Sequence, residues 1–207
     1  MGRVVRKSEA RVMVALGYVV LIGCGGGPAA PGAKDSGGTD GTTATDGGNP
    51  PGSKRIFITA TGYTGNLAGS AGADTICTAA SDVVGLGGRW TAWISTASSD
   101  ALSRIQEVGP WFLLDGTMVF TNKANFRTMP LAPIAVDEHG VAVAAGAVVW
   151  TGTLTGGIHS ATDCQGFTAA DSTVAGTVGI TSFVMSWTSA VSTANCASAL
   201  SLYCIEQ

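Results

Sequence analysis

Charged side chains are scarce in this chain of 207 residues, because Asp, Glu, Lys and Arg together make up only 12% of it. An average protein contains about 25% of them. The formal net charge is −3 and no block of five or six basic residues occurs, so the composition argues against nucleic acid as a partner. Thirty glycines and many Thr, Ser and Ala residues replace the usual charged surface. This balance suits a secreted or cell-surface domain with many turns.

The apolar run near the start of the chain is too short to span a bilayer. It covers the 12 residues 12–23, whereas a transmembrane helix needs about 20. A basic segment precedes it, with Arg3, Arg6, Lys7 and Arg11. This order is typical of a signal peptide, in which a positive segment precedes an apolar one. We therefore expect residues 1–23 to be a signal peptide.

The signal peptide ends in Leu21, Ile22, Gly23 and Cys24. These residues resemble the bacterial lipobox, in which the cysteine becomes the lipidated first residue of the mature chain. The resemblance implies a membrane anchor at Cys24, and the alternative is an ordinary secretory signal that happens to contain a cysteine. Residue 25 is Gly rather than Asp, which by resemblance to the Gram-negative sorting rule implies an outer-membrane lipoprotein of the cell envelope.

Large apolar residues are absent from residues 25–53, which contain no Val, Ile, Leu, Phe, Trp, Tyr or Met. Such a segment cannot bury anything, so we expect it to be disordered. We interpret residues 24–53 as a lipidated Gly/Pro/Thr tether with an r.m.s. span of about 30 Å. Its aspartates, Asp35, Asp40 and Asp46, are not spaced like the ligands of a calcium-binding EF-hand.

Residues 54–207 form the expected folded domain, which is long enough for one sizeable core. This domain has four cysteines, Cys77, Cys164, Cys196 and Cys204. An even number of cysteines behind an export signal predicts two disulfides. The residues alone leave three connectivities open.

One apolar stripe at helical spacing predicts a helix over residues 70–84, with Ser70 as its N-cap and Gly85 as its stop. The stripe comprises Ala73, Cys77, Ala80 and Val84. A shorter helix is expected over residues 100–108, capped by Ser98 or Ser99. Both helices lie in the first half of the domain.

Strands are expected at residues 55–61, 89–95, 111–114, 117–120, 134–136, 141–143 and 147–151, and again at the end of the chain. Asp115 and Gly116 separate two of these runs and predict a two-residue type I′ hairpin. Residues 152–184 have a weak pattern, so we expect a long loop region with one or two short strands. Two early helices among many short strands define an α+β class.

Three segments of the domain resemble endostatin, the C-terminal domain of certain collagens, which has a C-type-lectin-like fold. Residues 77–95 resemble its cysteine-bearing helix and following strand, and residues 148–152 with Cys164 resemble a later strand and cysteine. Residues 196–206 resemble its closing segment. The resemblance implies nested disulfides, Cys77–Cys204 and Cys164–Cys196, and a bacterial endostatin-like lipoprotein. The alternative fold is a disulfide-bonded β-sandwich.

The sequence departs from this family at its known binding sites. Calcium-dependent lectins of the fold use a Glu-Pro-Asn or Gln-Pro-Asp triplet, which is absent, and a Trp-Asn-Asp, whereas Trp187 is followed by Thr188 and Ser189. The zinc-binding histidines of endostatin have no counterpart at residues 53–55. The arginine cluster for heparin is also missing, because the domain has six basic and ten acidic residues. We therefore expect no metal and no cofactor.

Histidine, the commonest general base, occurs only twice, as His139 and His159. A hydrolase would pair one of them with a serine nucleophile and a carboxylate. Ser160 and Asp163 are near His159 in sequence, but sequence neighbours rarely form a triad, and no Gly-x-Ser-x-Gly elbow exists. We interpret both histidines as solvated loop residues, because a zinc site built from them lacks the usual ligand spacing.

Five tryptophans could stack on sugar rings, and most sit in strand patterns that predict core positions. They are Trp90, Trp93, Trp111, Trp150 and Trp187. Trp93 faces opposite to Trp90 in its predicted strand. We therefore choose Trp93 as the exposed tryptophan and as the candidate ligand contact.

These observations predict a non-enzymatic, lipid-anchored binding module of the cell envelope, with a polysaccharide or protein ligand and no need for calcium. The loop-rich residues 152–184 are the expected binding region, since ligand contacts concentrate on loops that a rigid scaffold holds. The alternatives are an envelope hydrolase and a structural surface protein without a ligand.

Overall fold

The computed structural model describes residues 49–207. The predicted signal peptide, the predicted lipidation site Cys24 and most of the predicted tether lie outside the described residues. Within the described part, no helix is both long and apolar enough to cross a membrane. The first strand begins at Lys54, where the folded domain was expected to start.

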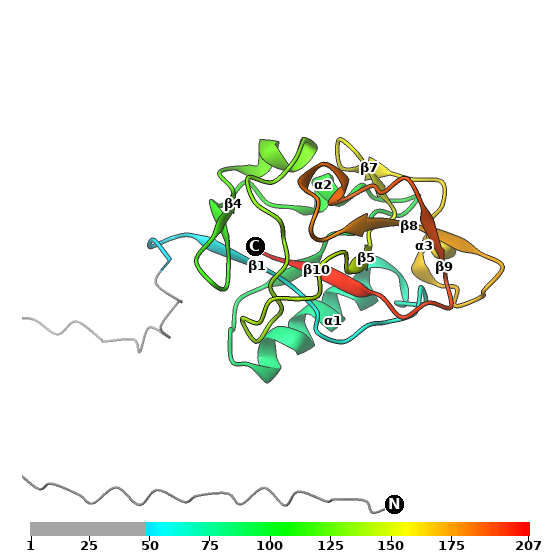
Figure 1. Ribbon diagram of the computed structural model, residues 1–207, viewed down its shortest axis with the longest axis horizontal. Coiled ribbons are helices and arrows are strands. Elements are labelled where there is room, and N and C mark those ends of the chain that lie inside the picture. Colours follow the sequence, from blue (N-terminus) through cyan, green and yellow to red (C-terminus); the bar gives the residue numbers. More distant parts are fainter. Residues whose placement is uncertain (1–48) are drawn as a thin grey trace, which may run out of the picture. The chain divides into compact units, whose positions relative to one another are not determined.

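The domain contains ten strands, three α-helical segments and two 3₁₀ turns (Figure 1). In chain order they are β1 (Lys54–Ile58), α1 (Gly69–Val83), β2 (Trp90–Ala92), α2 (Ala101–Arg104), β3 (Trp111–Leu113), β4 (Met118–Phe120), η1 (Lys123–Arg127), β5 (Val148–Trp150), β6 (Thr153–Leu154), β7 (Ile158–His159), α3 (Cys164–Phe167), β8 (Ala175–Ile180), η2 (Val184–Ser186), β9 (Thr193–Asn195) and β10 (Ser201–Glu206).

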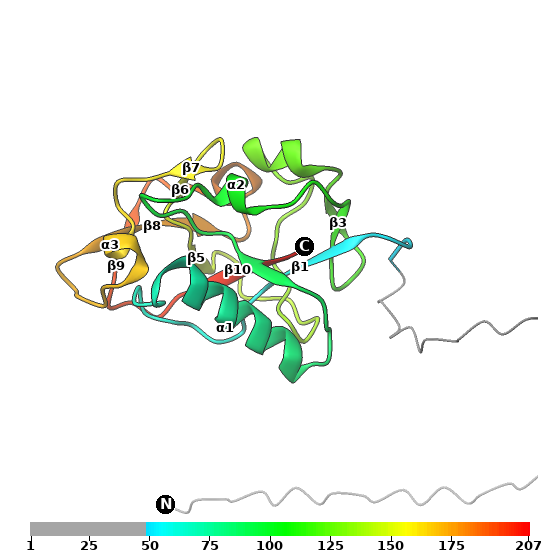
Figure 2. The ribbon, with the colours of Figure 1, turned by 180° about the vertical axis from the view of Figure 1, so that it is seen from behind.

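An eight-stranded mixed sheet forms the centre of the domain. Its order is β4-β3-β1-β10-β5-β8-β9, and β2 pairs with β10 outside this path. β1 is antiparallel to β10, with Phe57 opposite Cys204, whereas β3 is parallel to β1 and β5 is parallel to β10. The first and last strands therefore lie side by side in the middle of the sheet, as Figures 1 and 2 show.

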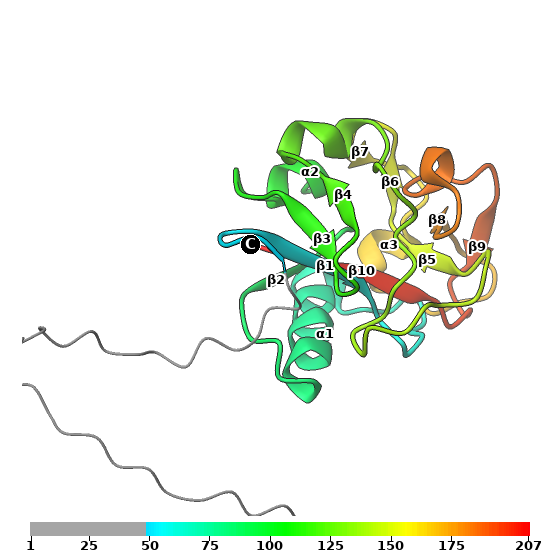
Figure 3. The same cartoon turned by 60° about the vertical axis from the view of Figure 1, so that its left-hand side comes forward.

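Both faces of this sheet are buried. Along β10, Leu202 and Cys204 belong to one core, and Tyr203 and Ile205 belong to the other. Residues 202–205 do not alternate between apolar and charged side chains, because each of them meets a covered face. Helix α1 covers the face of Cys204 (Figure 3). An aromatic cluster fills the opposite face, with Trp93, Trp111, Phe120, Phe126 and Trp187.

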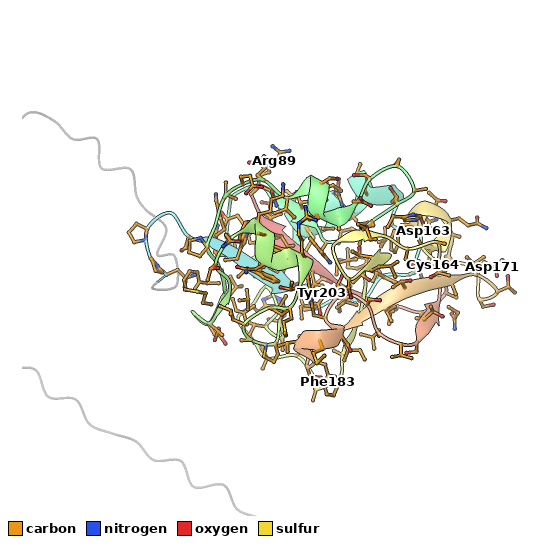
Figure 4. All side chains as sticks on the ribbon, turned by 90° about the horizontal axis from the view of Figure 1, so that it is seen from above. Arg89, Asp163, Cys164, Asp171, Phe183 and Tyr203 are labelled. Atoms are coloured by element: carbon orange, nitrogen blue, oxygen red, sulfur yellow. A yellow bond between two sulfur atoms is a disulfide. The ribbon has the colours of Figure 1, made fainter. Side chains whose placement is uncertain are left out.

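Tyr203 lies inside this aromatic core (Figure 4). Its ring centroid is 5.9 Å from that of Trp187. Its hydroxyl has no hydrogen-bond partner among the described residues. Burial raises the pKa of Tyr203, because a phenolate would lose its hydration there. The side chain therefore stays neutral wherever the fold survives.

Helix α1 has the predicted extent, but its start differs from the prediction. Ala68 precedes the helix with φ 59° and ψ 39°, and no side chain caps the first turn. The prediction of Ser70 as N-cap is therefore wrong, since Ser70 already lies within the helix. Gly85 follows the helix with a φ of 70°, the left-handed conformation that favours glycine at a helix end.

Two disulfides close the domain. Cys77–Cys204 joins α1 to β10, and Cys164–Cys196 joins α3 to the residue after β9. This is the nested pairing that the resemblance implied. The sequence separations are 127 and 32 residues, so the two bonds constrain loops of very different length.

Two local predictions need correction. The β3–β4 hairpin forms where predicted, but only Gly116 in its turn has a positive φ, of 87°. A type I′ turn needs a positive φ at both central residues, so the turn is of another type. Helix α2 ends at Arg104 rather than residue 108, and its N-cap is Asp100 rather than a serine.

Residues 152–184 contain more structure than their pattern predicted. They hold the β6–β7 hairpin, α3 and the six-residue strand β8, which belongs to the main sheet. Gly176 on β8 explains the weak signal, because a Cβ there would lie 2.7 Å from the Cys164 Sγ and 2.8 Å from the Trp150 ring. Glycine lets these side chains pack against the strand. Because Gly176 has no side chain, the alternation of apolar and polar residues that marks a strand is interrupted there.

The α+β class is confirmed. The helices are few, the main sheet is mixed and central, and two disulfides join its elements. This main sheet has a core on each face and therefore differs from the β-sandwich that was the alternative, and β6 and β7 form a separate two-stranded sheet.

Candidate functional site

An open hollow of about 800 Å³ lies where three segments of the chain meet. They are residues 68–71 at the start of α1, residues 96–98 after β2, and part of the segment 159–168, which falls inside the predicted binding region. The lining consists of short polar and small side chains with one histidine and one aspartate. We call this site the polar hollow.

His159 and Asp163 are the titratable pair of the polar hollow. Their Nε2 and Oδ2 atoms are 2.9 Å apart. The Asp163 side chain is 10% exposed and that of His159 is 26% exposed, so the carboxylate is buried behind a ring that water can reach. With Asp163 ionised, Nε2 carries the proton of a neutral ring and Nδ1 is left as an acceptor.

The backbone on both sides of the pair is fixed. Asp100 Oδ1 accepts a hydrogen bond of 2.7 Å from the backbone N–H of His159. Asp163 Oδ1 accepts one of 2.9 Å from the backbone N–H of Gly166. Asp163 therefore joins β7 to α3 through its two oxygens, and the position of the imidazole depends on it.

Helix α3 is a single left-handed turn. Its four residues have positive φ angles, of 53° at Cys164, 57° at Gln165, 68° at Gly166 and 60° at Phe167. This conformation costs roughly 1–2 kcal/mol for each residue that is not glycine. Such strain persists only where the surroundings impose it, and it concentrates at functional sites.

Three contacts impose this conformation. The Cys164–Cys196 disulfide holds the first residue. The Phe167 side chain is fully buried against Trp150, and its carbonyl accepts a 2.9 Å hydrogen bond from the N–H of Leu67. In Figure 4, Asp163 and Cys164 lie together at one end of the domain. The strained turn is thus a fixed wall of the polar hollow.

Ser160 does not complete a catalytic triad with this pair. Its hydroxyl is 2.7 Å from that of Thr177 and 3.1 Å from that of Thr162, in a cluster of hydroxyl groups next to β8. His159, however, is not the solvated loop residue that we expected, since it belongs to β7 and is paired with Asp163. Asp163 follows His159 by four residues. This spacing brings side chains together in a helix, but no helix was predicted at these residues.

His139 agrees better with the expectation of a solvated histidine. Its side chain is 50% exposed, and its Nε2 is 3.9 Å from the buried carboxylate of Glu138. Within residues 49–207, no group of three His, Cys, Asp or Glu side chains could hold a metal ion.

The choice of Trp93 as an exposed ligand contact is wrong. Trp93 does face opposite to Trp90, but that face of the sheet is covered, and its side chain is 0% exposed. Its ring stacks against Trp187 with centroids 4.9 Å apart, and its Nε1 donates a 2.7 Å hydrogen bond to the Thr188 hydroxyl. The other four tryptophans are also buried, so no tryptophan in the described part of the chain offers a platform for sugars.

Comparisons with known proteins do not identify this site. A scan against models of protein families finds no match, and no curated protein matches the sequence.

Proposed function

We propose that this protein is a recognition module that binds its ligand at the polar hollow without calcium. The observation that supports the proposal is the hollow itself, of about 800 Å³, between rigid elements. Its hydroxyl, amide and imidazole groups can hydrogen-bond a polar ligand. Few of them carry charge, so recognition by this site should depend weakly on salt.

We further propose a C-type-lectin-like, endostatin-like fold for the domain. The nested disulfides, the adjacent first and last strands and the polar hollow are compatible with it. In this view the protein is an endostatin-like lipoprotein, with residues 24–53 as a tether that presents the domain away from the membrane.

Anchoring at Cys24 is part of the same proposal, and it places the protein in the outer membrane. Mass spectrometry of the protein purified from its native membrane should find a lipid-modified Cys24 as the first residue. A mature N-terminus at another residue would contradict this part of the account, and a Cys24→Ser variant that fractionates like the native chain would contradict it too.

Binding itself can be tested with the full-length protein on glycan and matrix-protein arrays, run with and without chelator. Ala97 lines the hollow and is exposed, and its side chain is only a methyl group, so Ala97→Trp should fill the site without disturbing the core. The matched control is Ala79→Trp on the exposed face of α1. We expect binding that persists in the presence of chelator. This binding should be lost in Ala97→Trp and kept in Ala79→Trp. Binding that the chelator abolishes would refute a calcium-independent site.

One observation favours an envelope hydrolase as the second candidate. The His159–Asp163 pair joins an imidazole to a carboxylate as the base and orienting group of a triad do, but with the ring reversed, because Asp163 binds Nε2 and leaves Nδ1 as the free nitrogen. Among the described residues, no hydroxyl or thiol is hydrogen-bonded to His159, so the nucleophile is missing. Asp163→Asn would keep the bond to Gly166 but turn the imidazole to the wrong tautomer. A hydrolytic activity that falls by orders of magnitude in this variant would favour the enzyme.

A further inference from the structure

Three hollows border the turn of the β6–β7 hairpin, and each is lined by a different part of residues 155–159. His159 lines the polar hollow. Gly156, Gly157 and Ile158 line a second hollow of about 220 Å³, which we call the charged hollow. Thr155 lines a third of about 300 Å³, which we call the methionine hollow.

The hairpin that joins the three hollows is held on both sides. The Leu102 N–H of α2 donates a 3.1 Å hydrogen bond to the Gly157 carbonyl, and the Gly156 N–H donates one of 3.1 Å to the Arg127 carbonyl at the end of η1. Figures 1 and 3 show β7 and α2 side by side at the end of the domain away from α1. The hollows therefore keep their spacing.

The chemistry changes from one hollow to the next. The polar hollow presents His159 with short hydroxyl side chains. The charged hollow has both signs, with Asp100 and Glu107 facing Lys123 and Arg127. The methionine hollow lies between Met129 and Met185, which are 52% and 81% exposed.

We propose that the ligand of this surface is an extended polypeptide segment that crosses the hairpin and places an apolar side chain between Met129 and Met185. This inference rests on the proposed function and names the class of its partner. A polysaccharide repeats one unit or a few, and it would meet three sites of similar chemistry. Three neighbouring sites of different chemistry suit a chain whose side chains differ.

The methionines and the buried tryptophans support the same choice. Methionine side chains are flexible and polarisable, and they are common on surfaces that receive apolar side chains of peptides. No tryptophan of the described residues is available to stack on a sugar. The hairpin folds back between Thr155 and His159, since Leu154 pairs with Ile158. These residues therefore lie within about 14 Å of one another, a distance that about five extended ligand residues would cover.

The test is selection of binders from a displayed library of random linear nine-residue peptides on the immobilised full-length protein. Selected peptides are then measured against Met185→Glu, with Val83→Glu as the matched control. Val83 is 79% exposed and lies at the far end of α1, about 20 Å from the polar hollow by helix length. Both variants add one carboxylate at an exposed apolar position.

We expect selected peptides that share a large apolar residue near one end, bind Met185→Glu about tenfold or more weakly, and bind Val83→Glu unchanged. Peptides that bind Met185→Glu as tightly as the native protein would overturn the inference. A glycan ligand that Ala97→Trp abolishes, with no peptide selected, would also overturn it and leave the recognition function standing. If neither arrays nor library yield a ligand, the proposed function fails and this inference fails with it.

Discussion

The left-handed turn of α3 makes a direct prediction about stability. Gln165 is exposed and has φ 57° and ψ 51°, so Gln165→Gly removes little packing and relieves the steric cost of a Cβ in this conformation. That cost is roughly 1–2 kcal/mol. The added flexibility of glycine in the unfolded chain offsets about 0.5–1 kcal/mol of it. We expect a net stabilisation of about 0.5–1 kcal/mol.

The matched control is Ala79→Gly, at an exposed position inside the right-handed helix α1. There the same glycine should destabilise the domain by about 1 kcal/mol. The two variants should therefore differ by roughly 1.5–2 kcal/mol and in sign. Urea unfolding with disulfides intact, followed by tryptophan fluorescence, measures both. If Gln165→Gly is as destabilising as Ala79→Gly, then α3 is not strained. The argument that its surroundings hold α3 in a strained conformation at the polar hollow would then be wrong.

Two further predictions concern the disulfides and the core tyrosine. Chain entropy assigns about 5 kcal/mol to Cys77–Cys204 and about 4 kcal/mol to Cys164–Cys196, from separations of 127 and 32 residues. Replacing either pair by alanines should lower the free energy of unfolding by about these amounts, and non-reducing peptide maps that join Cys77 to Cys164 would contradict the pairing. Burial raises the pKa of Tyr203, so above pH 10 its phenol stays protonated in the folded state but ionises in the unfolded chain. Stability should therefore fall by about 1.4 kcal/mol per pH unit above pH 10. Tyr203→Phe should lack this component, and parallel stability curves for the two proteins between pH 9 and 11 would refute it.

Much of the scaffold was readable from the sequence because its signals are local. The stripe through Ala73 and Cys77 predicted α1, and a strand was expected at the end of the chain, where Leu202 to Ile205 form an apolar run. The disulfide pairing was not local, and it came from the resemblance to endostatin. Spacing alone left three connectivities.

The failures have physical causes. Alternation over residues 89–95 placed Trp90 and Trp93 on opposite faces, but alternation alone does not show whether a second core covers the other face. Strand β8 was missed because Gly176 makes room for Trp150 and Cys164, which removes the apolar pattern.

The candidate site was the least readable part of the domain. Its wall is a left-handed turn, whose positive φ angles at Cys164, Gln165 and Phe167 have no signature in residue type. Its His159–Asp163 pair lies outside any helix, so an i, i+4 spacing gave no reason to expect contact. Strands β6 and β7 are two residues each, which is too short for periodicity to show.

The central claim is that ligand binds in the polar hollow, and blocking that hollow tests it most directly. The measurement is the affinity of one ligand, taken from the arrays or the peptide library, for the native protein, Ala97→Trp and Ala79→Trp. The account predicts that Ala97→Trp loses binding by tenfold or more while Ala79→Trp keeps it and both remain folded. Equal affinity for all three proteins would contradict the account, because the ligand would then bind elsewhere.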